Sequence, residues 1–196
     1  MVGDAHDELS PTITRYHREI EHLLDLIEER PPGDTRREEL VEKLFVEVMR
    51  HQVAEVTFLD PLIRMRLDDG DETATAMLTQ HEQLETSLRG FERLEDGTDE
   101  FDAALKSLRT ALDDHARHQE HEVMPTLQSS IDTHDLDDVA ARMVPTQQAG
   151  ATMSHPSQPG EGTMSTERRS GLTDRVRDAF LVTEGVRVVG GSEDPS

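Results

Sequence analysis

Apolar residues recur at alternating steps of three and four along four stretches of this chain, with polar residues between them. The first stretch runs from Ser10-Pro11 to Arg30, and the second opens at Thr35, which has capping-box spacing to Glu38. The third stretch follows residues 68–71, and the fourth follows a turn at residues 96–99. Because such steps place one apolar stripe along a helix, the pattern predicts four amphipathic helices.

Short connections rich in Gly, Pro and Asp separate these helices. Helices joined in this way pack antiparallel, so we expect an all-α, up-down-up-down four-helix bundle over residues 1–143, ending in a short fifth helix at 135–143. Residues 144–170 are rich in Gly, Pro, Ser, Thr and Gln, which predicts a flexible linker. Residues 171–196 are expected to form a short amphipathic helix and a disordered end, a tail that packs on the bundle or binds a protein partner.

One histidine interrupts each apolar stripe: His17, His51, His81 and His115. The first two are 34 positions apart, as are the last two, and the two pairs are offset by 64 positions. The same offset relates Pro61 to Pro125, so the chain resembles a duplicated helical hairpin. At about 1.5 Å per residue, each histidine lies roughly 20–24 Å from the nearer turn. All four are therefore expected to meet in one layer of the bundle.

Composition restricts the chemistry available to this layer. The 196 residues include no cysteine, so any metal is held by nitrogen and oxygen atoms. The formal charge of −22 argues against nucleic acid and anionic membranes as partners. No apolar run approaches the roughly 20 residues of a membrane span, and the acidic N-terminus is unlike a signal peptide. We expect a cytoplasmic protein.

Four buried histidines in one layer need hydrogen-bond partners or a metal, because unpaired polar groups are costly inside a protein. Glu55 follows His51 by one helical turn on the same face, and this spacing lets an imidazole and a carboxylate bind one ion. Histidine and carboxylate ligands without sulfur suit iron, manganese or zinc. The sequence therefore predicts a metal site that contains Glu55 and the four histidines.

The sequence does not decide which residue of the fourth helix supplies a carboxylate ligand. The position equivalent to Glu55 is Gln119, a weak amide ligand. Glu120 comes five residues after His115 and points about 140° away from it on a regular helix. Pro125 lacks a backbone donor and permits the distortion that would bring Glu120 inward.

Glu122 is the second candidate on this helix, because it lies on the same face as His115, although roughly 10 Å further along the helix axis. It can instead pair with His118. A site that binds one ion firmly and a second loosely is consistent with these alternatives. The remaining histidines are expected to be solvated: His6, His22, His121, His134 and His155.

Several segments together resemble the hemerythrin-like family of HHE cation-binding domains, over about residues 8–130. The order of the histidines, their spacing and the trailing prolines all agree with that family. The matching segments are Tyr16-His17-Arg18-Glu19-Ile20, His51-Gln52-Val53-Ala54-Glu55, Phe58-Leu59-Asp60-Pro61-Leu62, His81-Glu82-Gln83-Leu84-Glu85 and the segment from His115 to Leu127. The tail looks like those of bacterial members.

The resemblance implies two non-haem iron ions joined by an oxo or hydroxo bridge, held by histidines and two bridging carboxylates. It makes the four layer histidines ligands and Glu55 a bridge, with Glu120 at the spacing of the second bridge. Oxygen-carrying members have a second histidine one turn along the third helix, where this chain has Glu85, a further candidate ligand.

The resemblance further implies a protein that binds or senses O₂, peroxide or nitric oxide. The histidine-rich ligand set favours such a metal- and gas-binding protein over an enzyme. One alternative is a di-iron enzyme that decomposes peroxide or nitric oxide. Another alternative is a metal-poor structural or interaction bundle, an interpretation suggested by Gln119.

Overall fold

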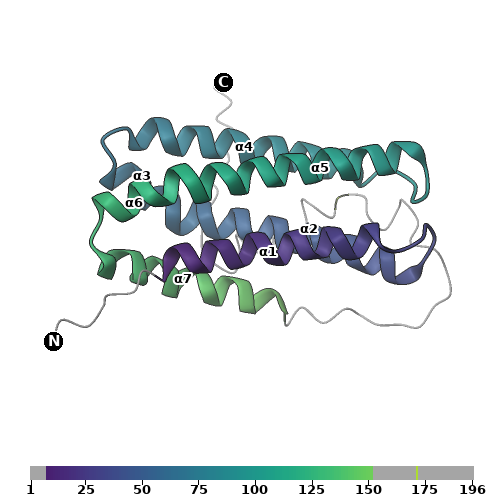
Figure 1. Cartoon of the computed structure of the whole chain (residues 1–196), viewed down its shortest axis with the longest axis horizontal. Helices are drawn as coiled ribbons and strands as arrows, with labels where there is room; N and C mark the ends of the chain where they lie inside the picture. Colours follow the sequence, from purple (N-terminus) through teal and green to yellow (C-terminus); the bar gives the residue numbers. More distant parts are fainter. Residues whose placement is uncertain (1–7, 152–170, 172–196) are drawn as a thin grey trace, which may run out of the picture.

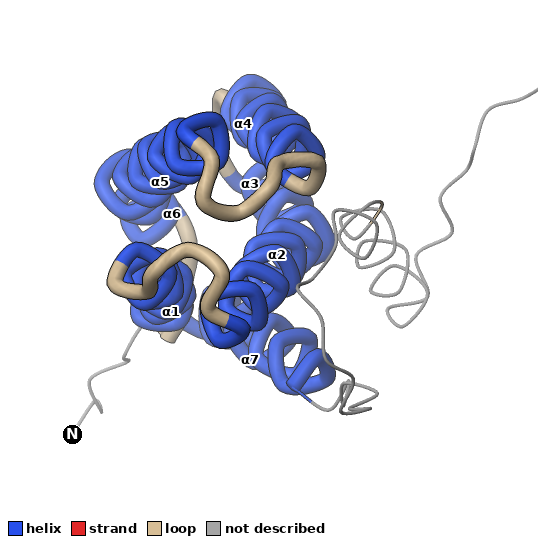
Figure 2. The backbone as a smooth tube through the Cα atoms, turned by 90° about the vertical axis from the view of Figure 1, so that its right-hand side faces the viewer, coloured by secondary structure: helices blue, strands red, loops and turns tan. Residues whose placement is uncertain are grey.

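The computed structural model describes residues 8–151 and Gly171, with the backbone alone for 145–151. Four long helices form its frame: α1 (Leu9–Glu28), α2 (Thr35–Ala54), α4 (Gly70–Phe91) and α5 (Asp99–His118). They run alternately in opposite directions (Figure 1), and seen end-on they occupy the corners of a square (Figure 2). The described residues contain no strand. The predicted all-α four-helix bundle is therefore confirmed.

The helix starts differ slightly from those expected. Helix α1 begins at Leu9, ahead of the expected Ser10-Pro11 start, and no side chain caps it. At α2 the side chain of Asp34 accepts a hydrogen bond from the Arg36 amide, so Asp34 is the cap in place of Thr35. An aspartate oxygen satisfies a free amide at a helix start as well as a threonine hydroxyl does, which is why the two residues compete for this position.

A π-helix interrupts the second and fourth expected helices, each just beyond its layer histidine. The segments are η1 (Glu55–Leu59), which leads into α3 (Asp60–Arg66), and η2 (Gln119–Val123), which leads into α6 (Met124–Ser130). Pro61 and Pro125 lie in the first turns of α3 and α6. Each proline lacks the amide that would bond to the carbonyl four residues earlier, so the regular α-helical ladder is broken there. The 64-residue repeat thus extends to the local distortion.

Two apolar clusters fill the bundle, one on each side of the histidine layer. The cluster nearer the two tight turns is built from side chains such as Leu24, Ile27, Phe45, Phe91 and Phe101. The other joins the opposite ends of the long helices to the short ones, through Leu9, Ile13, Leu59, Leu127 and Met143. The layer histidines therefore lie in a water-poor environment, where electrostatic interactions are strong.

A buried ion pair ties the two hairpins together at the end with the tight turns. Arg37 of α2 bonds to Asp96 in the turn before α5, with Nη1 and Oδ1 2.5 Å apart, and to Asp102 of α5 at 3.1 Å. Its Nε donates to the carbonyl of Ile27, and the amide of Gly33 donates to the other oxygen of Asp96. These contacts hold the first hairpin in register with the second.

Helix α7 (Thr133–Ala151) packs against α2 and α1, outside the square (Figure 2). It buries Leu136, Val139, Ala140 and Met143. The fifth helix expected at 135–143 is therefore present, but it continues to Ala151, beyond residue 144 where the linker was expected to begin. Residues 146–151 include two glutamines and two alanines, which favour helix, whereas the linker was expected from the composition of the whole segment 144–170.

The rest of the expected linker and the helix expected at 171–196 lie outside the described residues, apart from Gly171. The amide of Gly171 donates to Glu92 at the end of α4, at 2.9 Å. Within the described part of the chain, no helix is long and apolar enough to cross a membrane.

Candidate metal centre

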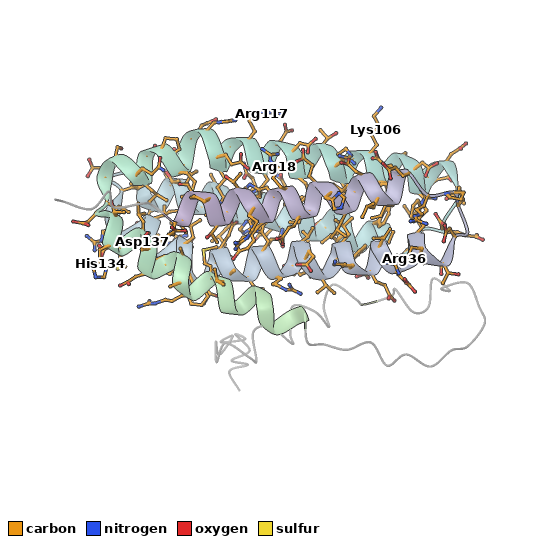
Figure 3. The ribbon with its side chains drawn as sticks, turned by 60° about the horizontal axis from the view of Figure 1, so that its bottom comes forward. Arg18, Arg36, Lys106, Arg117, His134 and Asp137 are labelled. Carbon is orange, nitrogen blue, oxygen red and sulfur yellow. The ribbon has the colours of Figure 1, made fainter. Side chains whose placement is uncertain are left out.

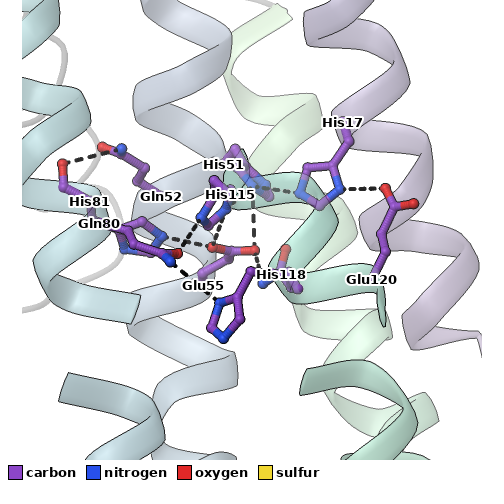
Figure 4. A network of polar contacts seen from close by, with 10 residues as sticks. His17, His51, Gln52, Glu55, Gln80, His81, His115, His118 and Glu120 are labelled. Carbon is purple, nitrogen blue, oxygen red and sulfur yellow. Dashed lines mark hydrogen bonds and ion pairs between the residues drawn. The ribbon is translucent and has the colours of Figure 1, made fainter. Parts of the chain in front are cut away.

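The four predicted histidines are brought together, one from each long helix (Figure 4). His17 comes from α1, His51 from α2, His81 from α4 and His115 from α5, and all four side chains are buried. Helical periodicity places each of them on the inward face, and their equal distances from the turns place them in one layer.

His51 lies at the middle of this group. Its Nε2 atom is 3.2 Å from Nε2 of His17, 3.3 Å from Nε2 of His115 and 3.3 Å from Oε1 of Glu55. These four residues each offer one ligand atom, and all the ligand atoms lie within 4.8 Å of one another. We call His17, His51, Glu55 and His115 the four-residue cluster.

Glu55 opens the π-helix η1 and is 1% exposed. Its Oε2 atom lies 2.9 Å from Nε2 of His81 and 3.5 Å from Nε2 of His115. His81 thus contacts the carboxylate of the cluster without belonging to the four-residue cluster. Glu55 connects the histidines of α4 and α5 to those of α1 and α2.

The protonation states suit a cation. Burial holds the pKa of His51 well below its usual value and also lowers the pKa of His17, although the nearby carboxylates oppose this. Burial by itself would raise the pKa of Glu55, but its contacts with His51, His115 and His81 outweigh that effect and keep the pKa well below its usual value. At neutral pH His17 and His51 are therefore neutral and Glu55 is ionised, the states in which these groups bind metals.

Hydrogen bonding alone does not satisfy this arrangement. A ring nitrogen carries either one proton or one lone pair, so Nε2 of His51 is unable to bond well to two other Nε2 atoms and a carboxylate at once. Within the described residues, Nδ1 of His51, Nδ1 of His81 and Oε1 of Gln119 are buried and have no hydrogen-bond partner. A cation at the cluster would accept the converging lone pairs, so the residues present fit a metal ion.

Gln119 and Glu120 open the π-helix η2 and contact different parts of the site. Gln119 is fully buried, and its amide donates to Oε1 of Glu55. Glu120 lies on the other side of the His17 ring, with Oε1 2.7 Å from Nδ1 of His17, and it also contacts Arg18 at 3.4 Å. The distortion expected near Pro125 is present, but Gln119 contacts the carboxylate of Glu55 and Glu120 contacts the remote nitrogen of His17, a place different from the expected bridge.

A carboxylate bonded to the remote nitrogen of a histidine fixes which ring nitrogen carries the proton and how the ring is turned. With Nδ1 of His17 donating to Glu120, Nε2 keeps its lone pair toward His51 and the cluster. Glu120 therefore positions His17 for metal binding.

The other predicted site residues lie away from the cluster. Glu85 pairs with Arg89, one turn further along α4, at 2.9 Å. Glu122 has a side chain that is 74% exposed and lies 3.9 Å from His118, the pairing expected as its alternative to metal binding. His118 bonds to Gln80, with Nδ1 and Nε2 3.4 Å apart.

Two glutamines lie near the histidines, and the sequence pattern did not indicate either of them. Gln80 of α4 accepts a hydrogen bond from Nδ1 of His115 at 3.3 Å, which leaves Nε2 of His115 free to face the cluster. Gln52 donates to the backbone carbonyl of His81 at 3.4 Å. Each glutamine is next to a layer histidine in the sequence, so apolar periodicity puts it off the inward stripe and offers no signal for it.

A pocket of about 270 Å³ leads to the cluster between α1 and α5. It is lined by the buried rings of His17, His51 and His115 and by the exposed side chains of Arg18 and Arg117. Figure 3 labels these two arginines, on α1 and α5. Since one water occupies about 30 Å³ of liquid, the pocket has room for several small molecules. The three ring systems are thus accessible from one side of the bundle.

A buried group of imidazoles and a carboxylate inside four antiparallel helices defines a metal-binding helical bundle. The family model described as "Hemerythrin HHE cation binding domain" matches residues 9–127. The chain therefore belongs to the hemerythrin HHE cation-binding family. No curated protein and no solved structure matches it.

Acid is expected to release the metal. Folding lowers the pKa values of His17 and His51 below the unfolded value of about 6.5, so the unfolded chain binds more protons below that pH. The contribution of these histidines to stability is present above pH 6.5 and falls with acidification, and that of Glu55 follows below about pH 4.5. Because protons also compete with the metal, bound metal should decrease below about pH 6.

Metal retained after ultrafiltration at pH 7, 6, 5 and 4.5 measures this release, and circular dichroism at each pH separates release from unfolding. Full retention of metal at pH 4.5 would contradict a ligand set dominated by histidine.

Proposed function

We propose that this protein holds iron in the four-residue cluster and uses it to bind or sense a small molecule such as O₂, peroxide or nitric oxide. The observation that carries the proposal is the pocket between α1 and α5, which connects the surrounding solvent to three of the cluster's residues. A purely structural metal site is closed by protein ligands, whereas a site that exchanges ligands keeps an approach open.

The metal supplies a position at which a small molecule binds, and the chain supplies the surroundings. His51 and His17 stay neutral because they are buried, and Glu120 and Gln80 fix the orientations of His17 and His115. The apolar clusters on both sides limit water around the site. A cytoplasmic location, and a protein partner for the segment beyond Ala151, belong to the same proposal.

Anaerobic loading with ferrous iron, followed by nitric oxide, peroxide or air in separate samples, tests the proposal. We expect the visible spectrum of the loaded protein to change with at least one of these molecules. The His51→Ala variant should give no change under the same conditions, because its iron is lost. An iron-loaded wild-type protein that responds to none of the three would refute the proposal.

A second candidate is an enzyme that decomposes peroxide or nitric oxide, since the same pocket would admit substrate and release product. Steady-state consumption of added peroxide or nitric oxide distinguishes turnover from binding. Equal rates for wild type and His51→Ala would show that the activity comes from a contaminant. Protein purified without an affinity tag and carrying less than about one-tenth of an ion per chain would favour the metal-poor bundle instead.

A further inference from the structure

The geometry points to a site that holds one metal ion tightly, where resemblance to the oxygen-carrying members implies two. This inference rests on the proposed function, because it concerns the same cluster. It rests on the number of ligand atoms that converge on one point and on the hydrogen bonds that the other candidate ligands already make.

The contacts of His51 in the four-residue cluster have the spacing of neighbouring atoms in the coordination shell of one ion, and all ligand atoms of the cluster lie within 4.8 Å of one another. Nitrogen and oxygen atoms bound to one ion at about 2.1 Å lie about 3.0–3.4 Å apart when they are neighbours in the shell. The contacts of His51 with His17, His115 and Glu55 measure 3.2, 3.3 and 3.3 Å. Three imidazoles and a carboxylate are enough protein ligands to hold one divalent metal, and an ion such as iron, which takes up to six ligands, would still have positions for a small molecule.

A second ion would have too few ligands. Once the four-residue cluster is assigned to one ion, the ligand atoms that remain nearby are those of His81, the second oxygen of Glu55 and the uncharged amide oxygen of Gln119. Glu85 pairs with Arg89, and Glu120 bonds to the remote nitrogen of His17. Metal sites in proteins usually have three or four protein ligands, and only two of these remaining atoms are strong ligands, so a second ion would be held weakly.

Gln119 occupies the place where the repeat would put a second carboxylate. It is offset from Glu55 by 64 positions, opens the second π-helix as Glu55 opens the first, and donates its amide to Glu55. The amide nitrogen that donates this hydrogen bond is no metal ligand, and the amide oxygen is a weak ligand that carries no charge. Two divalent ions beside one buried carboxylate would leave several positive charges uncompensated in a water-poor site, which is costly.

Titration of the metal-free full-length chain with ferrous iron under anaerobic conditions, and separately with Co²⁺, measures the number of ions. We expect the visible absorbance of the cobalt form to rise until one equivalent is added, and one iron per chain to survive gel filtration. Two tightly held ions would overturn this inference and leave the proposed function standing. No bound ion would overturn both.

Two variants test the reason for the stoichiometry. Gln119→Glu adds a second buried carboxylate beside Glu55, and it should raise the capacity from one ion to two. Gln119→Met has a side chain of similar length without a ligand oxygen and should stay at one. A capacity of one in a folded Gln119→Glu variant would overturn the role assigned to Gln119.

His81→Ala is a second test of the inference, which can be used if Gln119→Glu fails to fold. His81 is outside the four-residue cluster, so the variant should still bind one equivalent of metal. Loss of all bound metal from the folded His81→Ala variant would overturn the inference.

Discussion

Replacing His51 with alanine is expected to abolish metal binding while the bundle still folds. The ring contacts His17, His115 and Glu55 at once, so its removal takes away the central ligand of the cluster. Loss of a partner that only orients a ligand costs roughly 10–100-fold in metal affinity, and loss of a ligand should cost more. Calorimetric titration with Co²⁺ and metal analysis after gel filtration measure this effect.

The matched control is His22→Ala, which removes an exposed histidine from α1. This variant should bind metal as the wild type does. Thermal unfolding gives an independent measurement, because a ligand that binds the folded state raises the midpoint. Added metal should raise the midpoint of the wild type and of His22→Ala and leave that of His51→Ala unchanged. A metal-dependent rise in His51→Ala would contradict the central place of this ring.

Replacing Arg37 with methionine is expected to cost about 3–5 kcal/mol of folding free energy, the usual effect of removing one partner of a buried ion pair. The Arg37 side chain is 5% exposed and that of its partner Asp96 is 8% exposed. The substitution leaves the carboxylate of Asp96 buried, with the amide of Gly33 as the remaining contact described. It also removes a cation–π contact with Phe101. Urea unfolding followed by circular dichroism measures the loss.

Arg36→Met is the matched control, since Arg36 precedes Arg37 in α2 and its side chain is 67% exposed. Exposed ion pairs contribute little, so we expect a change below about 1 kcal/mol. Combining Arg37→Met with Asp96→Asn should recover part of the loss, because the uncompensated charge is removed. If Arg37→Met and Arg36→Met have equal stabilities, the buried ion pair does not fasten the two hairpins.

The four long helices and the inward direction of their histidines were predictable from the sequence. Apolar spacing identifies the buried face of a helix, and the constant rise per residue turns sequence distance into height. His17, His51, His81 and His115 therefore meet where the repeat places them. Glu55 follows by the same argument, because it lies one turn beyond His51.

The residues that face the site from α5 and η2 were less predictable. A π-helix changes the phase of the side chains beyond it, and a pattern based on 3.6 residues per turn does not contain that change. Pro125 signalled that a distortion was allowed, but it did not specify which neighbour would turn inward. Gln119 reaches Glu55, while Glu120 reaches His17 from outside the cluster.

Sequence by itself determined that this protein is a four-helix bundle with a histidine layer and one carboxylate on the same face, because helix periodicity is a local property. Only the packing of the helices shows that Gln119 bonds to Glu55, that Glu120 and Gln80 bond to the remote nitrogens of His17 and His115, and that a pocket opens between α1 and α5. These features depend on contacts between side chains from different helices. The distances between these side chains depend on how the helices pack and on the direction in which each helix turns its side chains. The order of residues along one helix does not reveal either of these.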